Sequence, residues 1–389
     1  METVAPFKEV IDEILEAGGE AFRFCFQCGL CDTVCPWNRV RQFSIRKIIR
    51  QATFGLTEID GEDIWRCTTC GRCPQHCPRG VKQIEVGMSL RRVASNYEIF
   101  PASVKSARTA RASIISEGNP LQGERKKRGD WAKDRPVKKF EEGMEVLYFV
   151  GCYLSYDPRM KKVATATAEI LDRAGVDFGI LGAQENCCGE SIRKTGSEEV
   201  FKRLARENIK TFVDNGVKKI LVSSPHCYHT FKNEYPEFMV SFEVVHIAQF
   251  LVELIEAGRL AFVTPVEMKA TYHDPCYMGR HNDIYDEPRK VLESIPGLEL
   301  VEMVDFKKDS LCCGGGGGRI WMDTPQNERF SDLRLKQAVE AGAQALVTAC
   351  PYCITNFEES RLNLEFEDVL EIQDLTEIVC ESIRENPNT

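Results

Sequence analysis

Two different periods of apolar and polar residues run along this chain, and they predict two kinds of structure. In residues 40–54 apolar positions recur at roughly helical spacing, and residues 1–20 and 82–97 have similar amphipathic patterns. After residue 143, short apolar runs such as EVLYFV and KKILV alternate with helical stretches such as KKVATATAEILDRAG. Strands that alternate with helices are typical of α/β units with a parallel sheet. The pattern therefore predicts an α+β multidomain protein, with a helical region followed by α/β units.

Residues 98–143 separate these two regions and have no clear period. They are basic and contain several Gly and Pro residues, so they are predicted to form a linker. Such a charge run either faces solvent as a simple connector or offers a docking surface to an acidic partner. We expect a helical domain at 1–97, the basic linker at 98–143, and the α/β region beyond it.

An internal repeat divides the α/β region into two copies, expected at 144–262 and 263–389. Each copy contains a strand, a cysteine, a helical stretch, a Cys-Cys-Gly tripeptide, a second helical stretch, a second strand and a final cysteine. Matching cysteines are 124 to 126 residues apart: Cys152 and Cys276, Cys187 and Cys312, Cys227 and Cys353. Because cysteines follow the strands, we expect them at the carboxyl ends of the sheets, where open α/β folds build their sites.

Composition narrows the possible surroundings and partners. With 389 residues the chain can form two or three domains, and its net charge of −9 argues against binding nucleic acid. Its first residues are acidic where a signal peptide would be apolar, and no run of about 18 apolar residues could span a membrane. We therefore expect a cytoplasmic, reduced protein without direct membrane insertion, whose 18 cysteines are not a disulfide framework.

Two cysteine runs in the helical region have the spacing C-x2-C-x2-C-x3-C-P. They are Cys25, Cys28, Cys31 and Cys35, and Cys67, Cys70, Cys73 and Cys77. Three thiolates of such a run hold one cubane [4Fe–4S] cluster, and the fourth cysteine reaches the other cluster. The predicted ligand sets are therefore Cys25, Cys28, Cys31 and Cys77 for one cubane, and Cys67, Cys70, Cys73 and Cys35 for the other. Two structural zinc sites are the alternative, but they leave the C-x3-C-P endings without a role.

Five cysteines mark the second copy, in the segments HDPCYMGR, LCCGGGGG and ACPYC. They are Cys276, Cys312, Cys313, Cys350 and Cys353. This pattern resembles the cysteine-rich Cys-Cys-Gly domain of heterodisulfide reductase catalytic subunits. The whole chain, a helical ferredoxin-like domain followed by two such copies, resembles the fused D-type subunit of that family over nearly all of residues 20–380. The resemblance implies that the five cysteines hold a noncubane [4Fe–4S] cluster.

The first copy departs from this pattern at one position. Its cysteines are Cys152, Cys187, Cys188 and Cys227. Ser224 occupies the position of Cys350, so one thiolate of the five is missing. Four thiolates still predict a metal site, and three occupants remain open: a second noncubane or altered cluster, zinc, or no metal. Ser224 either ligates iron weakly, leaves an iron open to substrate, or marks a lost ligand.

Other residues near the cysteines have both functional and structural interpretations. His226 and His229 either act on a sulfur as proton donors or hydrogen-bond partners, or fix the turn as structural histidines. His273 is expected to orient the loop of Cys276. The Gly314–Gly318 run lacks the following lysine of a phosphate loop, so we expect it to let backbone amides approach cluster sulfurs. Cys380 is predicted to be a buried small hydrophobic residue.

Two functions follow from these motifs. In the first, the chain is an electron-transfer subunit of a larger anaerobic oxidoreductase and relays electrons through two cubanes to the noncubane cluster. In the second, the paired copies form a catalytic site that reduces a disulfide. No flavin or nicotinamide fingerprint is visible, so we expect electrons to enter through a flavin-containing subunit of a hetero-oligomeric complex. No catalytic residue is assigned, and the intact ferredoxin motifs argue against a purely structural zinc module.

Overall fold

The computed structural model describes residues 6–56, 61–133, 135 and 137–385, and the chain divides into two compact units. The first unit contains the residues up to Thr109 and two later loops, Ser191–Phe201 and Gly314–Phe330. The second unit contains Ala110–Glu190, Lys202–Cys313 and the residues from Ser331 onward. Among the described residues, no helix is both long enough and apolar enough to cross a membrane.

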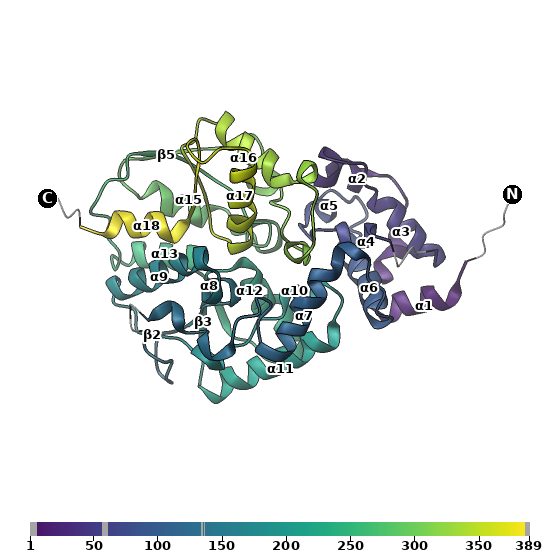
Figure 1. Ribbon diagram of the computed structural model, residues 1–389, viewed down its shortest axis with the longest axis horizontal. Helices are drawn as coiled ribbons and strands as arrows, with labels where there is room; N and C mark the ends of the chain where they lie inside the picture. Colours follow the sequence, from purple (N-terminus) through teal and green to yellow (C-terminus); the bar gives the residue numbers. More distant parts are fainter. Residues whose placement is uncertain (1–5, 57–60, 134, 136, 386–389) are drawn as a thin grey trace. The chain divides into compact units, whose positions relative to one another are not determined.

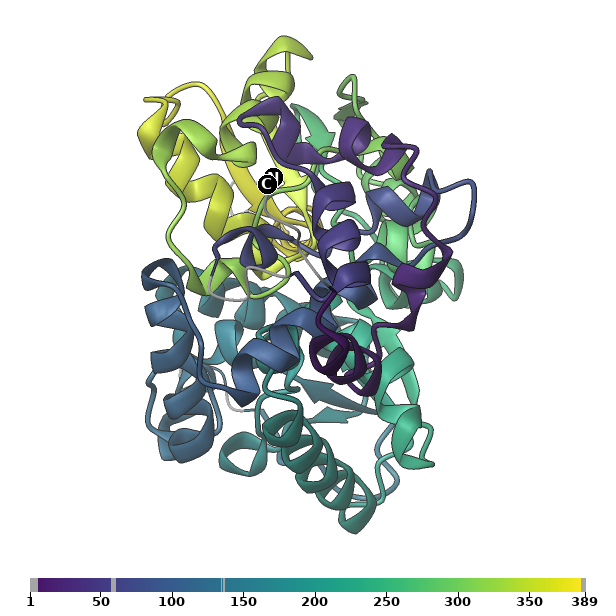
Figure 2. The same cartoon turned by 90° about the vertical axis from the view of Figure 1, so that its right-hand side faces the viewer.

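The N-terminal part of the first unit is helical, as predicted, and no strand occurs among its described residues (Figures 1 and 2). Its helices are α1 (Lys8–Glu16), α2 (Leu30–Val34), α3 (Ile45–Phe54), α4 (Asp63–Arg66), α5 (Arg72–Gln75) and α6 (Gln83–Asn96). Helix α3 covers the apolar stretch between the two cysteine runs and buries Ile45, Ile48, Ile49 and Ala52. Ser44 caps α3, because its hydroxyl accepts a hydrogen bond from the Lys47 amide. Residues 1–5 of the predicted first helix lie outside the described residues.

A buried arginine connects the two later loops of the first unit to its helical part. Arg91 is fully buried, and its guanidinium donates hydrogen bonds of 2.6–2.9 Å to four backbone carbonyls, those of Ile64, Cys67, Lys194 and Gly317. Gly317 has φ of +62°, and a Cβ at this position would lie 2.4 Å from the Cys67 carbonyl oxygen. Part of the glycine run therefore serves a close approach to a backbone carbonyl, whereas we expected an approach to sulfurs.

The first repeat forms a parallel four-stranded sheet in the order β2-β1-β3-β4. The strands are β1 (Val146–Phe149), β2 (Phe178–Gly179), β3 (Lys219–Val222) and β4 (Glu243–His246). The helices are α8 (Cys152–Tyr156), α9 (Pro158–Arg173), α10 (Glu190–Lys194), α11 (Glu198–Asp214), α12 (Pro225–His229) and α13 (Ile247–Glu256). The register places Leu147 of β1 beside Ile220 of β3. Apart from Lys219 at the start of β3, these central strands are apolar, because both of their faces are buried.

The second repeat forms a sheet with the same topology, in the order β6-β5-β7-β8. The strands are β5 (Met268–Tyr272), β6 (Leu298–Val301), β7 (Ala345–Thr348) and β8 (Glu371–Asp374). The helices are α14 (Gly279–Asn282), α15 (Asp286–Glu293), α16 (Phe330–Glu340), α17 (Pro351–Asn363) and α18 (Leu375–Ile383). Two parallel sheets of equal strand order confirm the predicted α+β class and the internal repeat. The outer strands were not predicted, since short or partly exposed strands give no continuous apolar run.

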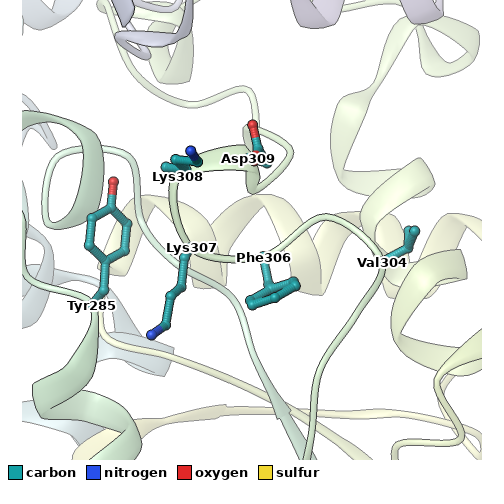
Figure 3. A pocket seen from close by; sticks show the side chains of 6 residues that line it. All are labelled: Tyr285, Val304, Phe306, Lys307, Lys308 and Asp309. Carbon is teal, nitrogen blue, oxygen red and sulfur yellow. The ribbon is translucent and has the colours of Figure 1, made fainter.

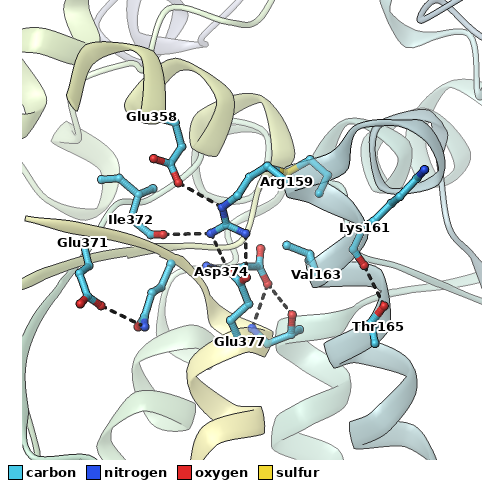
Figure 4. A network of polar contacts seen from close by, with 12 residues as sticks. Arg159, Lys161, Val163, Thr165, Glu358, Glu371, Ile372, Asp374 and Glu377 are labelled. Atoms are coloured by element: carbon cyan, nitrogen blue, oxygen red, sulfur yellow. Dashed lines mark hydrogen bonds and ion pairs between the residues drawn. The ribbon is translucent and has the colours of Figure 1, made fainter. Parts of the chain in front are cut away.

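The two repeats pack against each other through two pairs of helices. Helix α18 of the second repeat lies along α9 of the first, and α13 of the first lies along α15 of the second (Figure 1). At the start of α9, the Arg159 guanidinium donates two hydrogen bonds of 2.7 Å to Glu377 and one of 3.1 Å to Glu358 (Figure 4). It also donates to the Ile372 carbonyl at 3.0 Å. A single side chain of the first repeat thus binds three elements of the second, α17, β8 and α18.

The predicted linker at 98–143 contains more structure than a solvated connector would. Helix α7 (Lys105–Glu117) lies within it. Buried residues occur both in this helix and after it: Ala107, Ala110, Ile114, Arg128 and Trp131. Only some of its basic side chains are solvated, such as Lys126, whose side chain is 78% exposed.

Candidate metal centres

The two ferredoxin-like cysteine runs fold into loops with the same backbone pattern. In each loop the residue two positions after the first cysteine and the glycine after the second cysteine have positive φ. These residues are Gln27 (67°) and Gly29 (86°), and Thr69 (51°) and Gly71 (80°). Left-handed residues in such a turn let successive amides point to one side. In the second loop the Thr69 amide donates a hydrogen bond of 3.4 Å to the Cys67 sulfur.

Four cysteines from both runs line one cavity of the first unit. They are Cys25, Cys28, Cys31 and Cys77. The last cysteine of the second run thus joins the first three of the first run, which is the grouping that the predicted first ligand set requires. Burial and the neighbouring Asp32 carboxylate raise the pKa of Cys31 to about 12. The ligand assignment itself stays a prediction.

The remaining ferredoxin-like cysteines gather around Cys73. Burial raises the pKa of Cys73 well above its usual range, and the neighbouring thiolates of Cys67, Cys70 and Cys35, and of Cys31 from the other predicted set, raise it further. Cys35 belongs to the first run, so this group also contains one cysteine from the other loop. Cys35 and Cys73 are buried, whereas Cys67 is partly exposed.

In the first repeat, all four cysteines lie in one connected group. The Cys188 and Cys227 sulfurs are 3.5 Å apart, and the Cys187 thiol forms hydrogen bonds with both Cys152 and Cys188. Cys152 follows β1 and Cys227 follows β3, at the carboxyl ends of the strands, as expected. Ser224 is buried, and its hydroxyl donates a hydrogen bond to the Cys227 thiolate. The hydrogen bonds from Cys188 and Ser224 act to lower the pKa of Cys227, but burial and the neighbouring Cys152 and Cys187 thiolates outweigh them and raise this pKa.

A buried arginine, which the sequence analysis did not single out, touches this group. Arg128 Nη2 lies 3.5 Å from the Cys152 sulfur and 2.7 Å from Glu185 Oε1, and both charged side chains are 2% exposed. Glu185 also accepts hydrogen bonds from the amides of Val150 (3.0 Å) and Gly151 (2.9 Å). Burial alone would lower the pKa of Arg128, but Cys152 and Glu185 outweigh it and raise this pKa. A permanent cation therefore borders the first-repeat group.

The second repeat brings Cys313 and Cys350 together around Cys353. The Cys353 and Cys313 sulfurs are 3.3 Å apart, and Cys353 also forms a hydrogen bond with Cys350. Cys276 and Cys312 are 8% and 1% exposed. All five predicted ligands of this repeat are therefore buried.

His273 lies beside this second group. Its ligand atom is within 4.8 Å of the Cys313 and Cys353 sulfurs. Arg334 Nε donates to His273 Nδ1 at 3.1 Å, which fixes the ring. Burial, together with the Arg334 charge, lowers the pKa of His273 well below its usual range, so the ring is neutral. The expected role of His273 in orienting the Cys276 loop stays a prediction.

His226 lies in an aromatic stack that contains residues of both repeats. Its ring centroid is 4.3 Å from that of Tyr277 and 4.2 Å from that of Tyr352, and its Nδ1 is 3.2 Å from Glu190. Burial alone would lower the pKa of His226, but Glu190 and the Cys350 thiolate raise it to about 10. The protonated ring therefore donates to the Cys350 sulfur from the other repeat.

His229 packs at the edge of the same stack. Its ring is 5.0 Å from that of Tyr277 and 5.1 Å from that of His281. Its Nε2 lies 3.9 Å from the Glu234 carboxylate. These contacts are those of a structural histidine that fixes the turn after Cys227.

The four groups of thiols have the donor chemistry of iron–sulfur sites. All 18 cysteines lie in the described residues, and none forms a disulfide. Crowded, buried thiols hold their protons strongly unless a cation stabilises the thiolates, and soft thiolates select iron–sulfur clusters, zinc or copper(I). Cys380 is apart from these groups and buried in α18, as predicted.

A cavity of about 330 Å³ in the second repeat is separate from the cysteines. It is lined by Tyr285, Val304, Phe306, Lys307, Lys308 and Asp309 (Figure 3). Lys307 is held there by Asp286, at 2.8 Å, and its amide donates to Asp274 at 2.7 Å. None of the lining residues is a soft ligand, so this cavity is not part of a predicted metal centre.

Comparison with known families supports both kinds of cysteine site. Residues 21–81 match the 4Fe–4S dicluster domain, and residues 146–232 and 270–358 each match the cysteine-rich domain. These ranges contain the two ferredoxin-like runs and the two Cys-Cys-Gly repeats. The chain is thus an iron–sulfur protein.

Three relatives extend the similarity beyond single domains. The chain is 38% identical to the probable iron–sulfur-binding oxidoreductase FadF of Bacillus subtilis and 35% identical to the EtfAB:quinone oxidoreductase of Syntrophomonas wolfei. Each match covers 84% of this chain but 47% of the relative, so the chain spans about half the length of these two proteins.

The third relative matches nearly end to end. It is the D-type subunit of the dihydromethanophenazine:CoB--CoM heterodisulfide reductase of Methanosarcina barkeri, which is 32% identical over 92% of this chain and 93% of its own length. All three relatives are named as oxidoreductases or as a subunit of one. The chain belongs to the family of heterodisulfide reductase D-type iron–sulfur subunits.

Proposed function

We propose that this chain is an electron-transfer subunit of a larger oxidoreductase complex and holds two cubane clusters and one noncubane cluster. The observation that carries this proposal is the meeting of Cys77 with Cys25, Cys28 and Cys31 around one cavity. Such an exchange of the last cysteine between two loops is the ligand pattern of two-cluster ferredoxins. Bound iron–sulfur clusters supply one-electron transfer without bond making or proton uptake.

The proposed cubane ligands are the two exchanged sets, Cys25, Cys28, Cys31 and Cys77, and Cys67, Cys70, Cys73 and Cys35. The proposed noncubane ligands are the five cysteines of the second repeat, Cys276, Cys312, Cys313, Cys350 and Cys353. For the first repeat we propose an altered cluster on Cys152, Cys187, Cys188 and Cys227. The Arg128 guanidinium and the Ser224 hydroxyl both donate hydrogen bonds to sulfurs of this group, so they compensate part of its negative charge.

Two features of the Cys-Cys-Gly repeats favour electron transfer over disulfide reduction. The first is Ser224, which removes a thiolate from one of the two sites. The second is the stack of His226 with Tyr277 and Tyr352, three residues that are each next to a cysteine of one of the two groups. Their rings occupy space that a disulfide substrate bound between the groups would need. We propose a flavin-containing subunit as the electron donor or acceptor, because no flavin or nicotinamide fingerprint is visible in this sequence. Disulfide reduction is the second candidate, because the match to the heterodisulfide reductase D-type subunit covers 93% of that relative.

Iron analysis of cysteine variants tests the cluster assignment. Cys313→Ala should lose about four iron atoms per chain, the content of one [4Fe–4S] cluster, while the electron paramagnetic resonance signals of the cubanes persist. Cys77→Ala should instead alter the cubane signals and leave the second-repeat signal in place. Cys380→Ala is the matched control, since Cys380 is buried but lies outside the four groups. Unchanged iron in Cys313→Ala would overturn the assignment.

Turnover measurements separate the two candidate functions. Protein reduced anaerobically by dithionite should not consume a thiol heterodisulfide, because in the proposed role the chain passes electrons to a protein partner. Steady consumption of the heterodisulfide, with its loss in Cys313→Ala but not in Cys380→Ala, would favour the reductase instead.

A further inference from the structure

The surface around Cys28 combines an accessible cysteine with apolar side chains. Cys28 is the exposed member of the 18 cysteines. Phe24, Phe26 and Leu30 flank it in sequence and leave 57%, 58% and 44% of their surface exposed. Exposed apolar residues that gather in one place, unlike single scattered ones, mark interaction sites.

Arginine side chains border these apolar residues. Arg46 and Arg79 line the same cavity as Phe26, Leu30 and Cys28. Arg23 and Arg79 are exposed, and the Arg46 side chain is 48% exposed. We call the six residues Arg23, Phe24, Phe26, Leu30, Arg46 and Arg79 the Cys28 face.

The charge around the Cys28 face is opposite in sign to that of the whole chain. The charged residues of the Cys28 face, Arg23, Arg46 and Arg79, are all basic, whereas the whole chain has a net charge of −9. The nearby Asp32 accepts hydrogen bonds from the Ser44 hydroxyl (2.7 Å) and the Arg46 amide (3.0 Å), and its carboxylate lies 3.8 Å from the Arg46 guanidinium. Asp32 and Arg46 therefore partly neutralise each other, and Arg23 and Arg79 carry the positive charge of the face. The face therefore attracts an acidic surface and repels a basic one.

We propose that the Cys28 face is the docking site for an acidic redox protein that exchanges electrons with this chain. Aromatic and arginine side chains are the residue types that contribute most to binding energy at interfaces. A second copy of this chain is a poor occupant, since a symmetric contact would place arginines against arginines. The proposal rests on the proposed function, because docking next to Cys28 brings the partner close to the first set of cysteines.

The exchange is a transfer of one electron. The reduced iron–sulfur or flavin centre of the partner is oxidised by one electron as this chain is reduced by one, or the reverse, and no bond forms or breaks. Short-lived redox complexes of this kind bury less than about 1,200 Å² and depend strongly on charge. We therefore expect binding that weakens steeply as salt screens the arginines.

Binding measurements with two redox proteins of opposite charge test the proposal. The intact chain is titrated anaerobically with a small acidic ferredoxin and, separately, with a basic c-type cytochrome, at low and at about 0.5 M salt. We expect the chain to bind the ferredoxin at low salt and to lose at least tenfold in affinity at high salt. Any binding of the cytochrome would come from the acidic remainder of the chain, so charge reversal on the Cys28 face should not weaken it. Salt-independent binding of the ferredoxin, or no binding of it, would overturn the proposal.

Variants locate the contact on the Cys28 face. Phe26→Ser and Arg79→Glu should each weaken ferredoxin binding at least fivefold, and Arg23→Glu provides a further charge variant if either fails to fold. Phe7→Ser is the matched aromatic control, with 56% exposure against 58% for Phe26, and Lys126→Glu is the matched charge control. Both controls should bind within twofold of the unaltered chain. Equal losses in the controls would overturn the location.

Iron content and direct reduction distinguish this proposal from the proposed function. All variants should retain iron and be reduced by dithionite, a small donor that needs no docking surface. Retained iron with unaltered ferredoxin binding would overturn the docking site and leave the electron-transfer role standing. A chain without iron, or one that dithionite does not reduce, would contradict the electron-transfer role itself.

Discussion

At the scale of single residues, Arg128 shows how one buried side chain can decide the stability of the fold around the first-repeat cysteines. Its guanidinium and the Glu185 carboxylate form an ion pair that is almost completely excluded from water. Removal of one partner from such a pair leaves the other charge buried without compensation, at a cost of about 3–5 kcal/mol. The pair also connects the predicted linker to Cys152 and to the backbone that follows β1.

We expect Arg128→Met to lower the free energy of unfolding by about 3–5 kcal/mol, because Glu185 then stays buried as an uncompensated anion. Thermal and denaturant unfolding under anaerobic conditions measure this loss. The double variant Arg128→Met/Glu185→Gln should recover part of it, since no charge is left behind. A double variant less stable than the single one would show that the charge pair is not the cause.

Ser224 allows a second prediction at the residue scale. If the four cysteines of the first repeat already satisfy their metal, Ser224→Cys should leave the iron content per chain unchanged. The spectroscopic signal of the first-repeat metal should still shift, because in this variant a thiolate replaces a hydroxyl beside Cys227. An increase of about four iron atoms per chain would show instead that the first repeat lacks a cluster for want of a fifth thiolate.

At the scale of secondary-structure elements, the two repeats begin their last helices with different caps. His246 caps α13 and Asp374 caps α18, and each side chain accepts a hydrogen bond from the amide two residues later. Both caps are fully buried, which favours their neutral forms. Burial lowers the pKa of His246 to about 3 and raises the pKa of Asp374 to about 7.

The two caps should give opposite pH dependences of stability. His246 stabilises the fold above its unfolded pKa of about 6.5, and this contribution is lost as the pH falls toward 3. Asp374 stays protonated in the fold while the unfolded chain releases its proton above about pH 3.9, so its contribution is lost as the pH rises toward 7. Between about pH 4 and 6.5 the two slopes, each up to about 1.4 kcal/mol per pH unit, oppose each other.

We therefore expect the melting temperature of the unaltered chain to vary little between pH 5 and 6.5. Asp374→Asn keeps a capping oxygen but removes the titration, so its melting temperature should rise with pH in this window. His246→Asn should show the reverse, a melting temperature that falls as the pH rises. Parallel curves for all three proteins would contradict the opposed contributions of the caps.

The elements also show what the sequence could and could not predict. The cysteine spacing and the apolar runs of β1 and β3 correctly predicted two α/β repeats, because central parallel strands are apolar on both faces. Arg128 and Glu185 were missed because an ion pair between residues 57 positions apart leaves no local pattern. The edge strand β2 has two residues, too few for any periodic signal.

At the scale of the whole molecule, Arg159 is one of several polar contacts between the two repeats, together with the Arg384–Glu169 ion pair and the Arg173–Ile383 hydrogen bond. The side chains of Arg159, Glu377 and Glu358 are 17–26% exposed, so these ion pairs are neither fully exposed nor fully buried. Arg159→Met should therefore cost about 1–3 kcal/mol, more than a surface pair and less than a buried one. Arg203→Met is the control, since Arg203 is 49% exposed and its pair with Glu207 spans 3.9 Å.

Calorimetry checks this prediction. The Arg159→Met variant should melt at a lower temperature, while Arg203→Met should melt within a degree or two of the unaltered chain. Equal melting temperatures for both variants would show that the contacts of Arg159 contribute little to holding the repeats together.

The hydrogen bonds of Arg91 limit how this chain can be divided into fragments that fold on their own. Two of its four carbonyl partners come from the N-terminal region, and the other two come from loops more than 100 residues further along the chain. A fragment excised after residue 97 would keep the guanidinium but lose half of its acceptors, and a buried charge without acceptors is costly. The ferredoxin-like region is therefore not a portable module: an engineer who wished to graft it onto another protein would have to transplant both loops with it.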